Sequence, residues 1–395
     1  MKRIVLFGLV LALLLCGCGG KNTEAPAEKE KASENLQVTE AAPVETEETT
    51  VPTEATTVPT EPEIHRNPLT GEILDAPFTG RVYASTISNL HENMPHVGVN
   101  HADVIMEMYV NMNNVVRCLA LFTDIDSAEA IGSTRSTRPI FNDIAQHYDL
   151  VLAHAGGSDT ALEDAANRGI DNFNVDSWTV ADAGASYRDK EYRRSYENSL
   201  FVSGPGFRAY AEAQGVAQEL EKDYGFRFAE EGTPVEGEDA AKISWTMVYD
   251  RAKKDTAFVY NEELGKYVWN QYGKEMRDQI TDELETFTNV IIMQAAITNE
   301  GIYHMADFVA GGTGYYANGG KLIPIVWACD DEDSAFRFMT NDAQPLEMGV
   351  GNTYIAIVTP ESPIAWEPGE AAVAETVAET VAETAAETVQ ETAAE

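Results

Sequence analysis

Basic residues are scarce in this sequence of 395 residues. It has 27 lysines and arginines against 65 aspartates and glutamates, which gives a formal net charge of −38. The two ends carry only part of this excess, because residues 1–64 have a net charge of −6 and residues 367–395 a net charge of −8. Nucleic-acid binding needs a basic surface that neutralises phosphates. The composition therefore excludes a nucleic-acid partner.

Cysteine is also rare, and the four cysteines are Cys16, Cys18, Cys118 and Cys329. No CxxC or HExxH spacing occurs, so the sequence predicts no metal site. Cys118 and Cys329 lie far apart in apolar segments, which favours two buried thiols, with a disulfide as the alternative. The histidines that recur every five residues are His91, His96 and His101. This spacing matches neither one helix face nor one strand face, so we interpret them as loop and turn residues.

A long apolar run occurs at the N-terminus, where residues 4–15 follow Lys2 and Arg3. The run is too short for a permanent membrane helix and is typical of a signal peptide. It ends in a Leu-Cys-Gly-Cys sequence that looks like a lipobox, with a small residue directly before Cys18. We predict residues 1–18 to be a lipoprotein signal peptide and lipobox, with lipidation at Cys18. A plain secretory peptide is the alternative.

Lipidation at Cys18 predicts a location. Acyl chains such as palmitate contribute about 0.8 kcal/mol per buried methylene, so a multiply acylated cysteine holds a protein at a membrane. We expect the chain to be anchored on the outer face of the bacterial cytoplasmic membrane, outside the cytoplasm. The membrane is then a partner through the lipid.

Two acidic segments flank the central part of the chain. Residues 19–64 are rich in Glu, Thr, Pro and Ala, and residues 361–395 contain an Ala-Glu-Thr-Val repeat. The first segment has too few apolar residues to offset chain entropy, and Thr and Val weaken a helix in the second. We predict a disordered stalk and a disordered tail that acts as a spacer. Binding of cations or basic wall components by the tail is the alternative.

The remaining residues are enough for two domains. Residues 65–238 alternate strand and helix signals, which predicts an α/β domain. Its expected strands are 81–87, 104–110, 115–122 and 150–153, and its expected helices are 139–147 and the segment between Ser158 and Gly169. Pro139 suits the first turn of a helix, and Gly169 suits the position just after one.

Residues 239–360 are richer in strands, with the boundary in the acidic stretch 230–239. The expected strands are 243–249, 288–297, 321–327 and 353–358. The first of them alternates apolar and polar residues, as a half-buried strand does. The predicted fold is therefore an α/β N-terminal domain followed by a smaller β-rich α+β domain, with disordered acidic termini.

The segment 131–139 is the most unusual local feature of the sequence. It reads Ile-Gly-Ser-Thr-Arg-Ser-Thr-Arg-Pro and leads from a strand into a helix. Exposed N–H groups and the helix dipole hold anions at such a position, and arginine adds bidentate recognition of phosphate or carboxylate. We predict that Thr134, Arg135, Ser136 and Arg138 bind an anionic ligand. Pairing of the arginines with carboxylates inside the protein is the alternative.

Two further stretches are candidates for the same surface. The densest basic island contains Arg188 and Arg193, and the strand-to-helix corner of residues 154–158 contains His154 and Ser158. A tight turn at Gly156 and a helix cap at Ser158 are the competing interpretations. Because no GxSxG elbow occurs, nucleophilic catalysis is not supported.

The sequence resembles the YerB-like bacterial lipoproteins, a family of two domains of unknown function. The motifs that carry the resemblance span about 65–360 and are Asn67–Gly71, Ala102-Asp103, Arg117, 131–139, His154–Ser158, Tyr187–Asp189, Asn289-Val290 and the Gly-rich stretch before Trp327. The sequence departs from the family at 111–116 and 195–196. The resemblance implies the two-domain layout and the envelope location, and it supplies no reaction.

The order of motifs is also similar to that of the LytR–CpsA–Psr cell-wall ligases, which hold a polyprenyl pyrophosphate with a divalent metal. This resemblance implies that Asp103 is an acidic, catalytic ligand and Arg135 a pyrophosphate contact. Position 136 is Ser where those enzymes have Asp, which puts the carry-over in doubt.

Three functions follow from these observations. The first is a lipoprotein that binds an anionic cell-envelope ligand, such as a wall or lipid-linked phosphate, through the arginine-hydroxyl loop. The second is a metal-assisted phosphotransferase or hydrolase that acts on lipid-linked precursors, for which a divalent metal would be the cofactor. The third is a non-catalytic scaffold. No complete catalytic constellation decides between them, and the cofactor and protein partner are open.

Overall fold

The computed structural model describes residues 64–112, 115–189, 191, 195–229, 236–249 and 252–369. The predicted signal peptide with Cys18, the stalk, Arg193 and residues 370–395 lie outside this part of the chain. Within it, no helix is both long and apolar enough to cross a membrane.

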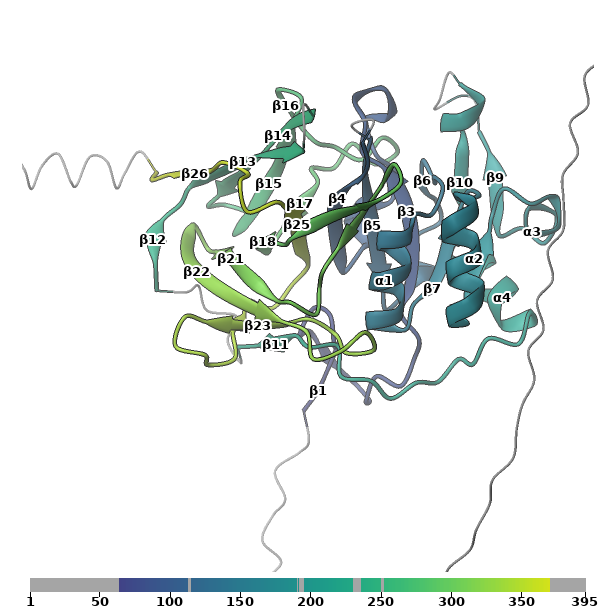
Figure 1. Ribbon diagram of the computed structural model, residues 1–395, viewed down its shortest axis with the longest axis horizontal. Coiled ribbons are helices and arrows are strands. Elements are labelled where there is room, and N and C mark those ends of the chain that lie inside the picture. Colours follow the sequence, from purple (N-terminus) through teal and green to yellow (C-terminus); the bar gives the residue numbers. More distant parts are fainter. Residues whose placement is uncertain are drawn as a thin grey trace, which may run out of the picture. The chain divides into compact units, whose positions relative to one another are not determined.

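A mixed sheet of 13 strands forms the centre of the molecule (Figure 1). From the first half of the chain it takes β3 (Tyr83–Ser88), β4 (Val104–Asn111), β5 (Val115–Phe122), β7 (Val151–His154) and β8 (Asn172–Asn174). From the second half it takes β12 (Glu238–Asp239), β18 (Asn289–Gln294), β19 (Ile297–Glu300), β20 (Tyr303–Ala306), β21 (Gly312–Asn318), β22 (Lys321–Ala328), β23 (Arg337–Thr340) and β25 (Thr353–Val358).

The two halves of the chain meet inside this sheet. β25 pairs in parallel with β4, with Thr353 opposite Val104 and Ala356 opposite Glu107. On its other edge β4 pairs antiparallel with β5. The predicted boundary near residue 238 therefore separates two stretches of sequence that contribute to one sheet, and the two-domain division stays a prediction.

Both faces of the large sheet are buried at its central strands β4, β5 and β25. In β5, Cys118 and Phe122 belong to one hydrophobic core, while Leu119 and Leu121 belong to another on the opposite face. A strand that is covered on both sides can be apolar at every position. This explains why residues 115–122 read as a continuous apolar run. It also confirms the predicted burial of Cys118, and Cys329 is likewise buried and free.

The α-helices of the described residues belong to the first half of the chain, and Figure 1 shows α1 near β7 and α3 beside β9. They are α1 (Pro139–Tyr148), α2 (Asp159–Arg168), α3 (Trp178–Asp182) and α4 (Gly204–Ala213). Pro139 occupies the first turn of α1, and Ser158 Oγ accepts a hydrogen bond from the Ala161 N–H at the start of α2. Gly169 ends α2 with a left-handed φ of 71°. The predicted start of α1 at Pro139, the cap of α2 at Ser158 and the end of α2 at Gly169 are confirmed.

A second sheet of six strands covers one face of the first. It contains β13 (Lys242–Tyr249), β14 (Ala252–Asn261), β15 (Lys266–Gln271), β16 (Lys274–Glu275), β17 (Thr286–Phe287) and β26 (Ile364–Glu367). Trp269 of β15 lies 4.9 Å from Tyr354 of β25, centroid to centroid, and Phe258 of β14 lies 4.8 Å from the same ring. An aromatic layer thus joins the two sheets.

Three small sheets complete the described structure. They pair β1 (His65–Arg66) with β2 (Ile73–Leu74), β10 (Leu200–Val202) with β6 (Ile131–Gly132) and β9 (Ser186–Arg188), and β11 (Arg227–Phe228) with β24 (Glu347–Met348). The 3-10 helices are η1 (His91–Asn93), η2 (Val99–His101), η3 (Ile125–Ser127) and η4 (Tyr196–Asn198).

The predicted fold class is confirmed: helices accompany the mixed sheet of the first half, and the second half is rich in antiparallel strands. One predicted limit needs correction. The tail was expected to begin at residue 361, but β26 pairs with β13 of the six-stranded sheet. Trp366 packs on Tyr315 with 5.4 Å between the ring centroids, which explains why order continues to this point.

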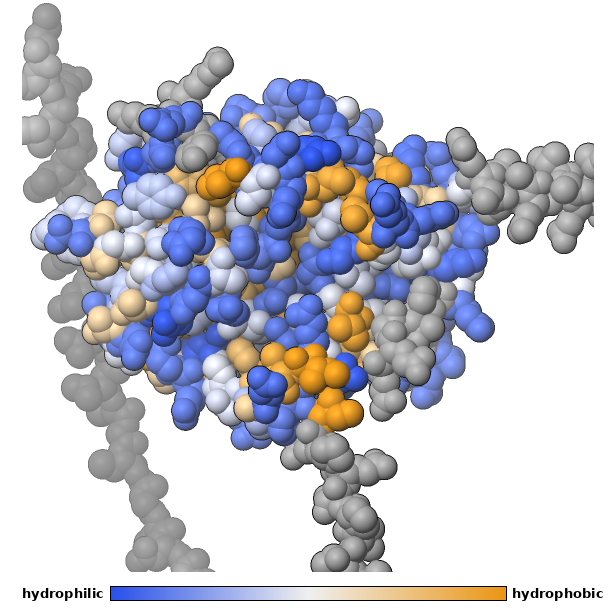
Figure 2. Space-filling model, turned by 180° about the vertical axis from the view of Figure 1, so that it is seen from behind, coloured by the Kyte–Doolittle hydropathy of each residue, from blue (hydrophilic) through white to orange (hydrophobic). Residues whose placement is uncertain are grey.

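Figure 2 shows the opposite face of the molecule, whose surface is largely hydrophilic. A broad apolar area lies at the end where β1 is found (Figure 2). Ile64 and Ile73, which flank and form this small β1–β2 sheet, are 60% and 71% exposed.

Candidate functional site

The arginine-hydroxyl loop is fixed by backbone hydrogen bonds on two sides. The Arg135 N–H donates to the Thr86 carbonyl over 3.0 Å. The Ala155 N–H donates to the Arg135 carbonyl, and the Thr137 N–H donates to the Gly156 carbonyl, both over 2.9 Å. The loop 131–138 therefore lies between the end of β3 and the turn after β7. This arrangement preorganises its side chains.

Arg117 of β5 reaches this loop from beneath. Its side chain donates from Nη1 to the Ser136 carbonyl, and the residue is 4% exposed. Nε is buried and has no hydrogen-bond partner. Burial lowers the pKa of Arg117, and the nearby positive charges of Arg138 and Arg135 lower it further. A cation held in this way is electrostatically unsatisfied.

Arg138 is the second unsatisfied cation. It precedes α1 as the N-cap residue, and its Nη1 donates to the Thr137 carbonyl over 2.6 Å. Its guanidinium carbon lies 5.3 Å from the centre of the Tyr303 ring, which belongs to β20. Nε is buried without a partner, and burial lowers the pKa of Arg138.

Neither Arg117 nor Arg138 forms an ion pair with a carboxylate in the described part of the chain. Most of the other described arginines do so within 4.0 Å: Arg81, Arg135, Arg168, Arg188, Arg208, Arg227, Arg277 and Arg337. In a protein with 65 acidic residues, the buried Arg117 and the half-buried Arg138 stand out because they lack such a partner. The arrangement suits an anion that enters from outside the protein.

Arg135 and Arg188 converge on a different element, the turn η4. Arg135 Nη1 donates to the Glu197 carbonyl over 2.8 Å and to Asn198 Oδ1 over 3.2 Å. Arg188 donates to the Tyr196 carbonyl and stacks on the Tyr196 ring at 3.7 Å. Arg188 is also ion-paired with Asp176 at 2.5 Å, as the competing interpretation expected. Arg135 has only a longer contact of 3.5 Å with the exposed carboxylate of Glu197.

The two predicted hydroxyl groups differ in their surroundings. Thr134 is fully buried, and its hydroxyl donates to the Ile131 carbonyl over 3.3 Å. Ser136 is partly exposed, and its carbonyl already accepts from Arg117. Of the two, only Ser136 has a side chain that reaches the surface.

His154 and Ser158 belong to the support of the loop. His154 is 1% exposed, and its two ring nitrogens contact the Gly156 carbonyl at 2.8 Å and Asn172 Oδ1 at 3.0 Å. Burial lowers the pKa of His154, which keeps the ring neutral. Since the Ser158 hydroxyl caps α2, neither side chain faces the arginines as a free ligand group.

Asp103 lies at the opposite end of β5. Its Oδ2 accepts from the Thr123 N–H over 2.5 Å and from Thr123 Oγ1 over 2.7 Å. Strands rise about 3.3 Å per residue, so roughly 20 Å separates Arg117 from Thr123 along β5. Burial raises the pKa of Asp103 to about 6. The structure does not bring this carboxylate and the arginine loop together as a shared metal site would require.

The described residues contain no cluster of three or more His, Cys, Asp or Glu side chains that could hold a metal ion. An open hollow of about 670 Å³ lies on the six-stranded sheet, and none of the predicted site residues lines it. Among its lining residues are Lys253, Asp255, Asn270 and Lys274.

Arg117 could have been found from sequence by a simple signal. It is the one charged residue in the apolar run 115–122, and arginine is almost never fully buried without a partner. Among the sequence patterns, only the family resemblance singles out Arg117. The same signal applies to Glu107 in the strand 104–111.

Two family models match the chain. "Protein of unknown function (DUF3048) N-terminal domain" matches residues 69–217, and the corresponding C-terminal domain matches residues 245–355. This chain belongs to the DUF3048 family. The arginine loop, Arg117 and Asp103 all lie within the part that matches the DUF3048 N-terminal domain.

The resemblance to the YerB-like lipoproteins is confirmed. A curated relative from Bacillus subtilis (strain 168), named "Putative lipoprotein YerB", is 22% identical to this DUF3048 chain over 315 residues, 74% of this chain and 88% of the relative. The crystal structure of the YerB protein from Bacillus subtilis matches with a TM-score of 0.63 at 20% identity, covering 76% of this chain and 99% of that one. This likeness shows the fold.

Proposed function

We propose that this DUF3048 protein binds an anionic cell-envelope ligand, such as a wall or lipid-linked phosphate, through Arg117, Arg135 and Arg138. One observation carries the proposal. Burial lowers the pKa of both Arg117 and Arg138, the charge of Arg135 lowers both further, and neither guanidinium has an ion-paired carboxylate in the described part of the chain. An incoming anion would satisfy both.

The site would act through geometry and low polarity. Guanidinium groups present donors in a planar fork that matches phosphate and carboxylate oxygens. Attraction between charges is stronger where water is excluded. Arg135 lies at the partly exposed edge of the loop, where its contact with Glu197 is long and replaceable. An anion would therefore meet Arg135 first and then Arg138.

The proposed location is the outer face of the cytoplasmic membrane, with a lipid on Cys18. The lipobox-like sequence supports it, and so does the lipoprotein name of the Bacillus relative. Metabolic labelling with a palmitate analogue tests it, because Cys18→Ser should lose both label and membrane association. Cys16→Ser is the matched control and should retain both. A labelled Cys18→Ser protein would refute the anchor.

The ligand experiment uses the full chain in detergent, with inorganic pyrophosphate and soluble wall fragments as probes. Hydrogen bonds to charged groups contribute about 1.5–3 kcal/mol each, so the Arg135→Ala/Arg138→Ala double variant should bind at least tenfold more weakly. Arg227→Ala is the matched control, because that arginine is half-exposed and paired with Asp223. Equal binding by the folded double variant and the wild type would instead favour a scaffold whose arginines serve the fold alone.

A further inference from the structure

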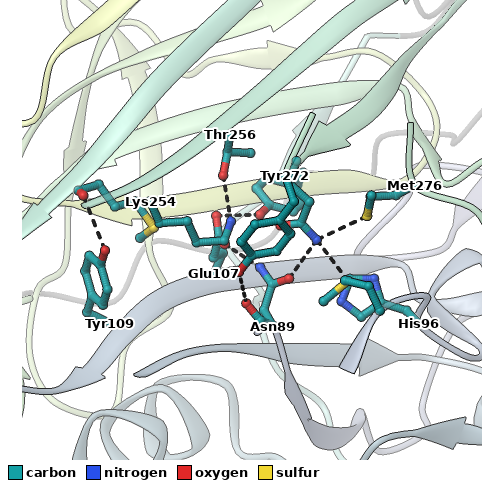
Figure 3. A network of polar contacts seen from close by, with 12 residues as sticks. Asn89, His96, Glu107, Tyr109, Lys254, Thr256, Tyr272 and Met276 are labelled. Atoms are coloured by element: carbon teal, nitrogen blue, oxygen red, sulfur yellow. Dashed lines mark hydrogen bonds and ion pairs between the residues drawn. The ribbon is translucent and has the colours of Figure 1, made fainter. Parts of the chain in front are cut away.

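A second buried charge cluster lies between the two sheets, away from the arginine loop (Figure 3). Glu107 of β4 and Asn89, which follows β3, are fully buried, and Lys254 of β14 is 6% exposed. Alternate residues of β14 point inward, so Lys254 shares the buried face with Thr256 and Phe258. Lysine and glutamate are rarely buried to this extent.

The three side chains meet at one atom. Glu107 Oε1 accepts from Lys254 Nζ over 2.6 Å and also contacts Asn89 Nδ2. Each hydrogen bond is about 3 Å or shorter, so the lysine nitrogen and the asparagine amide lie within about 6 Å of one another. Figure 3 shows both side chains directed toward Glu107.

The remaining partners hold the two reacting groups in place. Gln271 Nε2 donates to Asn89 Oδ1 over 2.8 Å, which polarises the side-chain carbonyl. The Tyr354 hydroxyl donates to Glu107 Oε2 over 2.7 Å, and Lys254 Nζ also donates to Thr256 Oγ1 over 2.7 Å. Each group therefore has a fixed position relative to the others.

The cluster lies beside an aromatic core, and its residues Lys254, Thr256 and Gln271 also line the open hollow on the six-stranded sheet. Trp245, Phe258, Trp269 and Tyr354 belong to this core. Desolvation makes a buried ion pair costly, and an apolar replacement is often at least as stable. An amine attacks a carbonyl only in its uncharged form, and Glu107 Oε1 is placed to take a proton from Lys254 Nζ.

We propose that Lys254 and Asn89 form an intramolecular amide bond, with Glu107 as the catalytic proton carrier. Lys254 Nζ passes a proton to Glu107 and attacks Cγ of Asn89, while Gln271 stabilises the oxygen that becomes negative. The Nζ–Cγ bond forms and the Cγ–Nδ2 bond breaks. Nδ2 leaves as ammonia after receiving a proton from Nζ through Glu107, and the proton that remains departs with it as ammonium. No oxidant or cofactor is needed.

The bond would join distant parts of the chain. Asn89 lies within the DUF3048 N-terminal match and Lys254 within the C-terminal match. A cross-link that closes a long loop restricts the unfolded chain more than a short one does. It would serve a protein whose two described cysteines are buried and free.

Mass spectrometry of the trypsin-digested full chain tests the proposal. Trypsin does not cleave after a modified lysine, so peptide 82–117 should appear joined to peptide 254–266. The joined pair should weigh about 17 Da less than the sum of its parts, because ammonia is lost. Two separate peptides of unmodified mass in the wild type would overturn the proposal. The same loss confined to peptide 82–117 would also overturn it, because that indicates a succinimide at Asn89.

Variants separate catalysis from structure. Glu107→Gln should give unlinked peptides, and so should Lys254→Arg, which keeps the charge but removes the nucleophile. Glu285→Gln is the matched control, since Glu285 is equally buried but contacts His96 instead, at 2.9 Å. A linked pair in Glu107→Gln would refute the role of Glu107, whatever the stability of that variant.

Discussion

At the scale of single residues, this protein is defined by charges placed where apolar side chains are expected. Arg117 interrupts the apolar strand β5, and Glu107 interrupts the apolar strand β4. Buried charged side chains reduce the stability of the fold unless a counter-ion or a bound ligand compensates their charge. Arg117 has no acidic partner in the described structure, and Glu107 has Lys254.

Replacing Arg117 by Met separates the effect of this arginine on stability from its effect on anion binding. Met is an unbranched apolar side chain that fills much of the space of the arginine stem, and it removes a buried cation without a counter-ion, so Arg117→Met should unfold at the same or higher denaturant concentration than the wild type. Its affinity for pyrophosphate should fall at least tenfold. Chemical denaturation and calorimetric titration measure the two effects. A large loss of stability would show that Arg117 serves the fold.

Asp103 gives a prediction about pH. Its pKa is about 6 in the folded protein against 3.8 for the free side chain, so the folded state retains a proton that the unfolded chain releases. Stability should therefore fall as the pH rises from about 4 to about 6, by at most about 3 kcal/mol from this residue. Asp103→Asn does not titrate, so its stability relative to the wild type should increase over this range. A constant difference in denaturation free energy between the two pH values would contradict this.

At the scale of elements, the sequence predicted the limits of two helices correctly, because these limits depend on neighbouring residues. Pro139, Ser158 and Gly169 fixed the limits of α1 and α2, because caps act within one helical turn. Strands β14 and β15 were missed, since their charged and polar residues, such as Lys254 and Gln271, gain inward positions only from the opposing sheet. The arginine loop was predicted from the sequence. Arg117, which donates to the Ser136 carbonyl of this loop, was not predicted to join it, because only the tertiary fold brings β5 next to the loop.

The cap at Ser158 can be distinguished from a ligand group. Ser158→Ala removes the bond to the Ala161 N–H, which should reduce the free energy of unfolding by about 1 kcal/mol. Anion affinity should stay within a factor of two, because the hydroxyl is used by α2. Reduced affinity at unchanged stability would instead place Ser158 among the ligand contacts.

At the scale of the whole molecule, the central sheet depends on both halves of the chain. β4 lies between β5 from the first half and β25 from the second. Tyr354 of β25 in turn packs on Phe258 of β14, with 4.8 Å between the ring centroids, so separating the two halves would expose this contact as well. Without β25, the eight-residue strand β4 would have an unpaired edge, and such an edge promotes aggregation.

Truncation tests this dependence. A chain that ends at residue 238 lacks β25, so it should remain aggregated or only partly folded, without the cooperative unfolding of the full chain. Size-exclusion chromatography and thermal circular dichroism provide the measurement. A monomeric, cooperatively folding fragment would support two independent domains with a boundary near that residue.

The central claim is that the arginine loop and Arg117 receive an anion from outside the protein. Titration of inorganic pyrophosphate into the full chain, followed by calorimetry, tests it most directly. Saturable binding is expected for the wild type and for Arg227→Ala, with at least tenfold weaker binding for the Arg135→Ala/Arg138→Ala variant. Identical isotherms for all three folded proteins would contradict the claim.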